Sequence, residues 1–252
     1  MRIQNLAFIF SFLFAAQAFG QSGEDATVSS NDDTRVIGAG LQRLEANGFT
    51  AEALLEQDVS GQDGQPIGEV INFEISDDNL IQRVLINSDG FLGIDETVIA
   101  VPYDAIDLTE DEDGIRAKIE EDDTDAYSIF SPNDKSTASA GSYRVSSLIG
   151  DDVLLKGGDE FGYLSDLAFD RNGRLQAVIV QPDITIDAEG YYAFPFERSN
   201  VSGTSFDPSA SSYSVSLDRE AVLKNQAFDY NAFSENSILS SSATQTSETS
   251  SQ

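Results

Sequence analysis

One segment of this sequence has the residue types and spacing of a cation-binding loop. It reads Thr109-x-Asp111-x-Asp113-Gly114-x5-Glu120. In an EF-hand, oxygen ligands alternate along the loop, a glycine allows a sharp turn, and a glutamate six residues later completes the calcium shell. Here a threonine replaces the first acid, and strand-like residues flank the loop where an EF-hand has helices. We interpret the segment as a solvated acidic turn, with a loose calcium-type site formed by Asp111, Asp113 and Glu120 as the alternative.

The composition excludes most other chemistry. The chain of 252 residues has 44 acidic and 14 basic residues, no cysteine and no histidine. Ser-His-Asp catalysis, Cys-His catalysis, disulfide bonds and His- or Cys-ligated zinc are therefore excluded. Paired carboxylates, as in glycoside hydrolases, stay chemically available, but 44 acids guarantee close pairs by number alone. We expect no catalytic residue, no cofactor and no enzymatic activity, with a carboxylate-based hydrolase as the least favoured alternative.

The net charge of −30 limits the binding partners. A strongly negative field repels nucleic-acid phosphates and anionic membrane surfaces unless basic residues are concentrated in one place. In this chain the lysines and arginines are scattered singly. We therefore expect an unknown protein partner and no nucleic acid, and the sequence predicts no oligomeric state.

Both ends of the chain differ from its middle. Residues 1–20 begin with a positive charge at Arg2, continue with the apolar run 6–16 and end in small residues at signal-peptidase spacing. The run is shorter than the roughly 20 residues that cross a bilayer, so a cleaved signal peptide is preferred to an uncleaved anchor. Residues 21–48 are expected to form a flexible leader with a short helix, and residues 235–252 a disordered Ser/Thr-rich tail. The protein is predicted to be periplasmic or secreted, with no transmembrane segment after cleavage.

The middle of the chain contains an internal duplication. The residues from Phe49 to Ile86 match those 94 positions later, from Tyr143 to Val180, and after the next loop the offset becomes 93. Seven residues of the first copy recur identically 94 positions on: Leu54, Asp58, Val59, Gly64, Gly68, Gln82 and Val84. Identity at a constant spacing predicts two copies of one structural module.

Each copy has the pattern of short antiparallel strands. Residues 67–75 alternate between apolar and polar, as in a half-buried strand, and residues 81–86 and 96–101 are rich in β-branched side chains. The pair Asp63-Gly64 is typical of a hairpin turn, and Gly157-Gly158 has the equivalent place in the second copy. This spacing favours small barrels or sandwiches over a parallel sheet.

The two copies end differently. Residues 115–119 are expected to form the last strand of the first copy, and residues 213–217 alternate cleanly and are their counterpart. Asp218 then has the position of an N-cap for a short helix over residues 219–226.

Several short motifs together point to a family. In the first copy they are Asp58-Val59, Asp63-Gly64, Ile67-Gly68-Glu69-Val70, Gly90-Phe91-Leu92-Gly93 and Ala100-Val101-Pro102-Tyr103-Asp104-Ala105. This set resembles the PRC-barrel family, and the resemblance extends to the second copy, which departs from it at Pro182-Asp183-Ile184 and at Phe196-Glu197. The family implies a small all-β barrel that acts as a docking or accessory module without a shared catalytic residue. Known members act in a photosynthetic reaction centre and in ribosome maturation, and neither role is expected here, because this chain lacks the membrane helix of the first and is acidic and exported.

The sequence therefore predicts an all-β protein with two small PRC-like β-barrels in tandem, a short C-terminal helix and disordered ends. The barrels are expected at residues 49–130 and 143–234, with a linker at 131–142. The predicted function is that of a non-catalytic exported binding or adaptor protein, which docks a partner protein or envelope component through strand edges or the groove between the barrels. A cation-responsive module using the acids of residues 109–125 is the alternative.

Overall fold

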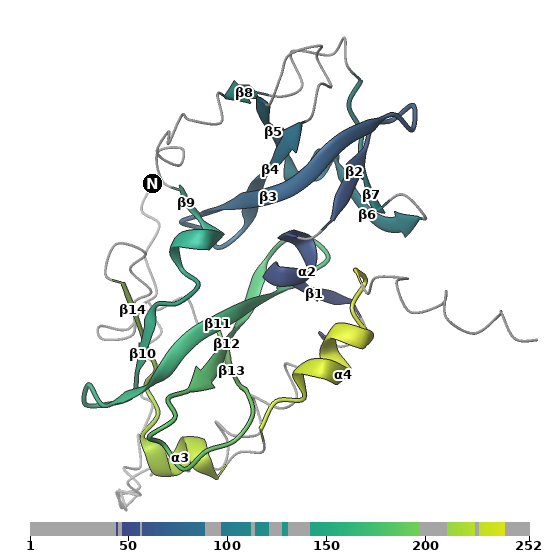
Figure 1. The fold of residues 1–252 in the computed structure, drawn as a ribbon. Coiled ribbons are helices and arrows are strands. Elements are labelled where there is room, and N and C mark those ends of the chain that lie inside the picture. Colours follow the sequence, from purple (N-terminus) through teal and green to yellow (C-terminus); the bar gives the residue numbers. More distant parts are fainter. Residues whose placement is uncertain are drawn as a thin grey trace, which may run out of the picture.

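The computed structural model describes residues 44, 47–55, 57–88, 97–111, 114–120, 128–130, 142–196, 211–224 and 227–239. These residues form two mainly antiparallel sheets, one built largely from each half of the chain (Figure 1). The all-β fold class is confirmed, with a few short helices. The hydrogen-bonded ladders of the described strands do not close into complete cylinders.

The first half supplies most of one sheet. Its strands, in the order β6-β7-β2-β3-β4-β5-β8, are β6 (Ile106–Asp111), β7 (Gly114–Ala117), β2 (Asp58–Ser60), β3 (Pro66–Ser76), β4 (Ile81–Ser88), β5 (Thr97–Pro102) and β8 (Ser128–Phe130). The 3-10 helix η1 (Tyr103–Ala105) joins β5 to β6. The strands predicted at 67–75, 81–86, 96–101 and 115–119 correspond to β3, β4, β5 and β7.

The second half repeats this arrangement. Its strands, in the order β13-β12-β11-β10-β14, are β13 (Tyr192–Pro195), β12 (Leu175–Pro182), β11 (Glu160–Asp170), β10 (Asp152–Leu154) and β14 (Ser212–Ser214). The strand expected at 213–217 is therefore β14, which is shorter and begins one residue earlier.

The strand registers of the two halves are equivalent. Val59 pairs with Gly68 as Val153 pairs with Gly162, and the bulges in β3 and β11 recur at the same places. Val59 also pairs in parallel with Ile115, and Val153 with Tyr213. Because these two parallel pairings are equivalent, β7 and β14 are counterparts, as the sequence predicted.

The two halves exchange their first strands. The strand β1 (Gly48–Thr50) pairs with β11 of the second half, so that Phe49 lies opposite Phe169. The strand β9 (Ser142–Arg144) pairs with β3 of the first half, so that Tyr143 lies opposite Ile75. Both pairings occupy equivalent positions, and each half therefore completes the sheet of the other.

The length of β3 and β11 explains why this exchange is stable. Each of these strands has 11 residues, and the short strand of its own half, β2 or β10, covers only the first part of one edge. An uncovered strand edge leaves backbone N–H and C=O groups without partners. The exchanged strands β9 and β1 cover the second part of the same edges.

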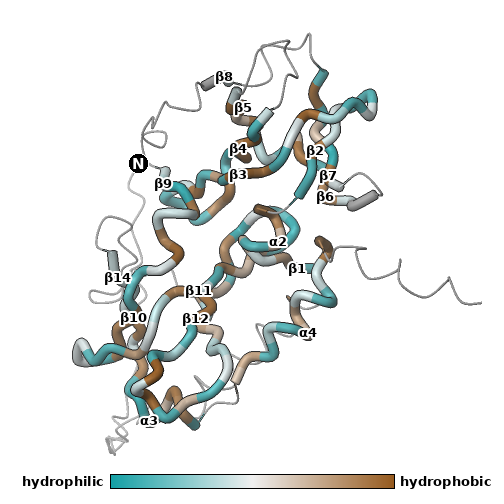
Figure 2. The backbone as a smooth tube through the Cα atoms, in the orientation of Figure 1, coloured by the Kyte–Doolittle hydropathy of each residue, from teal (hydrophilic) through white to brown (hydrophobic). Residues whose placement is uncertain are grey.

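One hydrophobic core spans both halves. The ring of Phe169 stacks on Phe49 with centroids 5.6 Å apart and meets Phe73 edge-on at 5.5 Å. The helix α2 (Ala51–Leu55) packs against both β3 and β11 and lies between the sheets (Figure 1). Its counterpart is the 3-10 helix η2 (Val145–Ser147), which packs on β3. Figure 2 shows hydrophobic stretches along both long strands, so the halves are separate in sequence but share their interior.

The C-terminal region contains two short helices. The helix α3 (Arg219–Leu223) begins at the predicted N-cap, where Asp218 Oδ1 accepts a hydrogen bond of 2.8 Å from Ala221 N, but it ends three residues earlier than expected. The helix α4 (Tyr230–Glu235) was not predicted. The expected disorder from residue 235 onward is wrong for residues 235–239, because Leu239 is buried and the Ser237 hydroxyl donates to the Gly48 carbonyl.

Other expectations lie outside the described residues. They concern the signal peptide at 1–20, most of the leader at 21–48, the Gly90–Gly93 motif, the tail at 240–252 and the linker at 131–142, except that its last residue, Ser142, begins β9. In the part of the chain that the structure describes, no helix has the length and apolar character needed to cross a bilayer.

Candidate functional site

The calcium-like segment forms a β-hairpin. Asp111 pairs with Gly114 at the turn between β6 and β7, next to Asp58 at the start of β2. The Ile119 carbonyl accepts a hydrogen bond from Gln62 N, beyond the other end of β2, so Glu120 lies at the far end of the hairpin from Asp111. Asp113 and the side chain of Asp111 lie outside the described residues. Among the residues that are described, no three potential metal ligands come together.

A different pair of acids meets between the halves. The Tyr230 hydroxyl of α4 lies 2.7 Å from Glu52 Oε2 of α2 and 2.6 Å from Asp166 Oδ2 of β11. Asp166 follows a β-bulge in β11 and pairs across the ladder with Ile179, and its Oδ1 accepts hydrogen bonds from the backbone N–H groups of Leu167 at 2.7 Å and Glu52 at 3.3 Å. Three elements that are distant in sequence thus converge on one carboxyl group.

The surroundings of Asp166 favour its protonated form. Its exposed fraction is 2 %. Burial, which disfavours the charged carboxylate, raises the pKa of Asp166 to about 6, although the hydrogen bonds from Tyr230, Leu167 and Glu52 N act in the opposite direction. The pKa of Tyr230 is raised by burial and by the charge of Asp166, so its hydroxyl keeps its proton.

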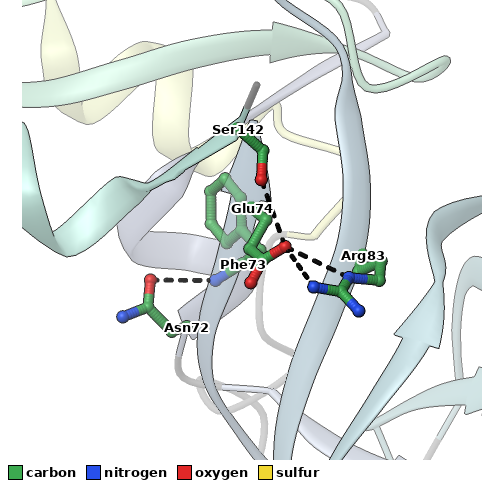
Figure 3. Close-up of polar contacts among 5 residues, drawn as sticks. All are labelled: Asn72, Phe73, Glu74, Arg83 and Ser142. Atoms are coloured by element: carbon green, nitrogen blue, oxygen red, sulfur yellow. Dashed lines mark hydrogen bonds and ion pairs between the residues drawn. The ribbon is translucent and has the colours of Figure 1, made fainter. Parts of the chain in front are cut away.

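The first half has a neutral version of this contact. Asn72 corresponds to Asp166 and Ser146 to Glu52, both at the 94-residue offset. Asn72 Oδ1 accepts a hydrogen bond from Phe73 N at 2.9 Å (Figure 3), and its amide donates to the Ser146 hydroxyl at 2.7 Å. The duplicated fold therefore needs a polar side chain at this bulge, and only the second half places two carboxyl groups there.

A buried ion pair distinguishes the first half. Glu74 Oε2 accepts hydrogen bonds from Arg83 Nε at 3.1 Å and Nη2 at 2.6 Å, and from the Ser142 hydroxyl at 3.4 Å (Figure 3). Glu74 is only 2 % exposed. The counterparts in the second half are Ala168 and Ala177, so this ion pair belongs to one half alone.

The equivalent apolar surface of the second half is covered by α4. We call residues Ala168, Ala177, Ile179 and Ala193 of β11, β12 and β13 the alanine face. Phe233 of α4 packs on it and is fully buried. Asp166 is buried beneath Tyr230 of the same helix, so Glu52 is the member of the pair that is open to solvent. The carboxylate-based hydrolase considered from the sequence therefore gains no support from these two acids.

Residues 140–206 match the PRC-barrel domain family. The matched segment runs from just before β9 to beyond β13, so it includes the strand that is donated to the first half. Gly162 and Pro195, which correspond to Gly68 and Pro102 of the sequence motifs, lie within the match. No curated protein matches the chain.

The PRC-barrel segment also presents an exposed apolar side chain on an ordered turn. Ile184 is 99 % exposed. Asp183 Oδ1 accepts hydrogen bonds from Thr185 N at 2.8 Å and from its hydroxyl at 2.7 Å, and Asp183 N donates to the Phe161 carbonyl at 2.9 Å. Ile186, the next apolar residue, is buried. The turn is thus fixed to β11, while Ile184 projects into solvent.

The sequence did not indicate Tyr230 or Asp166 as site residues. One signal was available for α4, because Asp229 precedes it and caps it, with Oδ1 accepting a 3.0 Å hydrogen bond from Ala232 N. Asp166 has no comparable signal, since nothing in its spacing separates it from the other acids of the chain.

Proposed function

We propose that this chain is a non-catalytic, exported binding or adaptor protein in which two PRC-barrel-like halves form one docking platform. The family match at residues 140–206 supports the assignment for the second half. The equivalent registers of β2–β4 and β10–β12 support a second copy of the same module in the first half.

The observation that carries the docking role is the position of Ile184. An isolated surface isoleucine is common, but a fully exposed one on a turn fixed by three hydrogen bonds loses little conformational freedom on binding. Pre-organised apolar side chains of this kind are suited to insertion into a pocket of a partner.

The charges on the loop around Ile184 indicate which kind of pocket the partner has. Asp183, Asp187 and Glu189 are exposed around Ile184. An apolar anchor surrounded by acids complements an apolar pocket with a basic rim, because opposite potentials favour encounter and register. The partner is a protein or envelope component with such a pocket.

We propose the outer surface, rather than the groove between the barrels, as the docking site. The space between the halves is occupied by β1, α2, β9 and the shared core. Docking is therefore assigned to the outer surface, at the loop of residues 183–190. Export rests on residues 1–20, and the place of action is the periplasm or the external medium.

The experiment is site-specific photocrosslinking in the native host. A photoreactive amino acid is placed at position 184, and the matched control, from which we expect no such adduct, carries it at Ile71, an exposed apolar position on β3 of the first half. We expect a discrete adduct from position 184 that an excess of unlabelled chain suppresses and that excess Ile184→Ser chain does not suppress. No adduct at 184, or equal suppression by both competitors, would refute docking through Ile184.

A further inference from the structure

The residues 228–239, which we call the C-terminal strap, join the two halves on the outside. At one end, Phe228 N donates to the Tyr191 carbonyl beside β13 at 2.6 Å. In the middle, Phe233 covers the alanine face. At the other end, Ile238 N and the Ser237 hydroxyl donate to the Gly48 carbonyl of β1 at 3.1 and 3.2 Å.

Tyr230 of the strap lies against two carboxyl groups, and hydrogen bonds to both of them require that one of these carboxyl groups carries a proton. The Tyr230 hydroxyl has one hydrogen, yet it lies within hydrogen-bond distance of carboxyl oxygens on both Glu52 and Asp166. If both acids are ionised, only one of the two short contacts is a hydrogen bond, and the other brings two oxygen lone pairs together. Both contacts are hydrogen bonds when one carboxyl group is protonated.

The extra proton belongs on Asp166. Glu52 is exposed to solvent, where water stabilises a carboxylate charge, whereas Asp166 is buried. Among the described residues, the groups facing Asp166 are the Glu52 carboxylate and N–H from α2, the Tyr230 hydroxyl from α4 and, across the ladder, the side chain of Ile179 in β12. The Thr50 hydroxyl of β1 faces Tyr230. None of these groups is a cation that would stabilise an ionised Asp166.

We propose that Glu52, Tyr230 and Asp166 form a proton-operated latch that holds the C-terminal strap on the alanine face. In the closed state Asp166 donates to the Tyr230 oxygen, and Tyr230 donates to the ionised Glu52. Loss of the proton from Asp166 removes one of these hydrogen bonds and leaves a buried charge, which opening of the strap relieves by hydration.

The direction of the pH effect follows from this proton. The pKa of Asp166 is raised above its ordinary value of 3.8 to about 6 when the strap is closed. The latch is therefore strongest below about pH 4 and weakens as the pH rises through about 6. This difference in the pKa of Asp166 between the closed and open states corresponds to an increase of up to about a hundredfold in the fraction of chains whose strap is open. Because Phe233 and Leu239 stay buried in the closed form, the strap opens transiently and stays mainly closed.

Hydrogen exchange of the full chain tests the proposal. Protection of the amides of the strap is compared at pH 5 and pH 7.5, after correction for the intrinsic pH dependence of exchange. We expect opening to increase about tenfold from pH 5 to pH 7.5, while amides of β4 in the first half change little. Asp166→Asn, which copies Asn72 of the first half and cannot ionise, should make opening independent of pH. Glu235→Gln, which removes an exposed acid from α4, should keep the wild-type response.

Carbon-13 NMR of the Asp166 carboxyl group provides a second readout that does not depend on the variants. A titration midpoint near 6 supports the latch, and one near the ordinary value of 3.8 overturns it. Equal opening at the two pH values in the wild-type chain, or a full pH response in Asp166→Asn, would also overturn it.

Discussion

Leu80 and Arg174 form an antiparallel β-bridge between the two halves, although each occupies the same place in its own half, 94 positions from the other. The flanking hydrogen bonds are also equivalent, from Ile81 N to the Gly173 carbonyl at 2.9 Å and from Leu175 N to the Asn79 carbonyl at 3.0 Å. A bridge between equivalent residues lies on a local two-fold axis. The two halves are thus related like the subunits of a two-fold dimer fused into one chain.

The shared core and exchanged strands predict that the halves unfold together. The chain contains no tryptophan, so Ile71→Trp in β3 and Tyr163→Trp in β11, both at partly exposed positions, provide one fluorescent probe for each half. We expect both probes to report the same urea midpoint, because neither sheet is complete without a strand of the other half. Two separate transitions would show that the halves are independent.

Phe169→Ala is expected to destabilise both halves equally. The ring of Phe169 is fully buried against Phe49 and Phe73, so its removal leaves a cavity at the junction and costs about 3–5 kcal/mol. Leu223→Ala, at an exposed position of α3, should change the free energy of unfolding by less than about 0.5 kcal/mol. A loss of stability reported by the β11 probe alone would contradict the shared core.

The duplication and most strands could be predicted from the sequence, but the exchange could not. Alternating apolar residues and Gly-containing turns fix β3, β4, β11 and β12 locally. The strands β1 and β9 have three residues each, too few to carry a pattern, and two similar halves offer them two equivalent edges. Which edge is taken depends on packing around Phe49 and Phe169, far apart in the sequence.

The candidate site could not be predicted for a related reason. The burial of Asp166 results from α4, because Asp166 pairs with Ile179 of the alanine face and Tyr230 of α4 lies over its carboxyl group. Tyr230 falls near the end of the predicted second barrel and the disordered tail was expected from residue 235, so the sequence predicted no helix over residues 230–235. Two apolar side chains order this segment, because Phe233 packs on the alanine face and Leu239 is buried in the core shared by the halves.

The glycine that recurs at positions 68 and 162 should tolerate no side chain. A Cβ atom would overlap the Asn87 carbonyl oxygen at Gly68 and the Gln181 carbonyl oxygen at Gly162. We expect either glycine-to-alanine change to cost about 3 kcal/mol or more in urea unfolding, since backbone of the neighbouring strand must move. Gly64→Ala is the matched control, because it has φ +80° but open space, and should cost only about 1 kcal/mol.

The buried ion pair of the first half should show strong coupling. Arg83→Ala removes both arginine hydrogen bonds to the buried Glu74 carboxylate, so we expect a cost of about 3 kcal/mol. Glu74→Ala with Arg83→Ala, which reproduces the alanines of the second half, should cost less than the sum of the single changes. A double-mutant cycle by urea unfolding measures the coupling, expected at about 1.5 kcal/mol or more. Additive single changes would show that the pair contributes nothing specific.

The free energy of unfolding of the whole chain should depend on pH through the protonation of Asp166. The folded chain binds a proton at Asp166 more tightly than the unfolded chain, because burial raises the pKa from 3.8 to about 6. This contribution is fully present below about pH 4 and is lost as the pH rises through about 6. Asp166→Asn lacks this pH-dependent contribution. The contributions of the other acids are the same in both proteins and cancel when the two free energies of unfolding are subtracted. We therefore expect the free energy of unfolding of Asp166→Asn, relative to wild type, to rise by about 2–3 kcal/mol between pH 4 and pH 7.5. Urea unfolding at a series of pH values measures this difference, and a flat or falling curve would place the titrating group elsewhere.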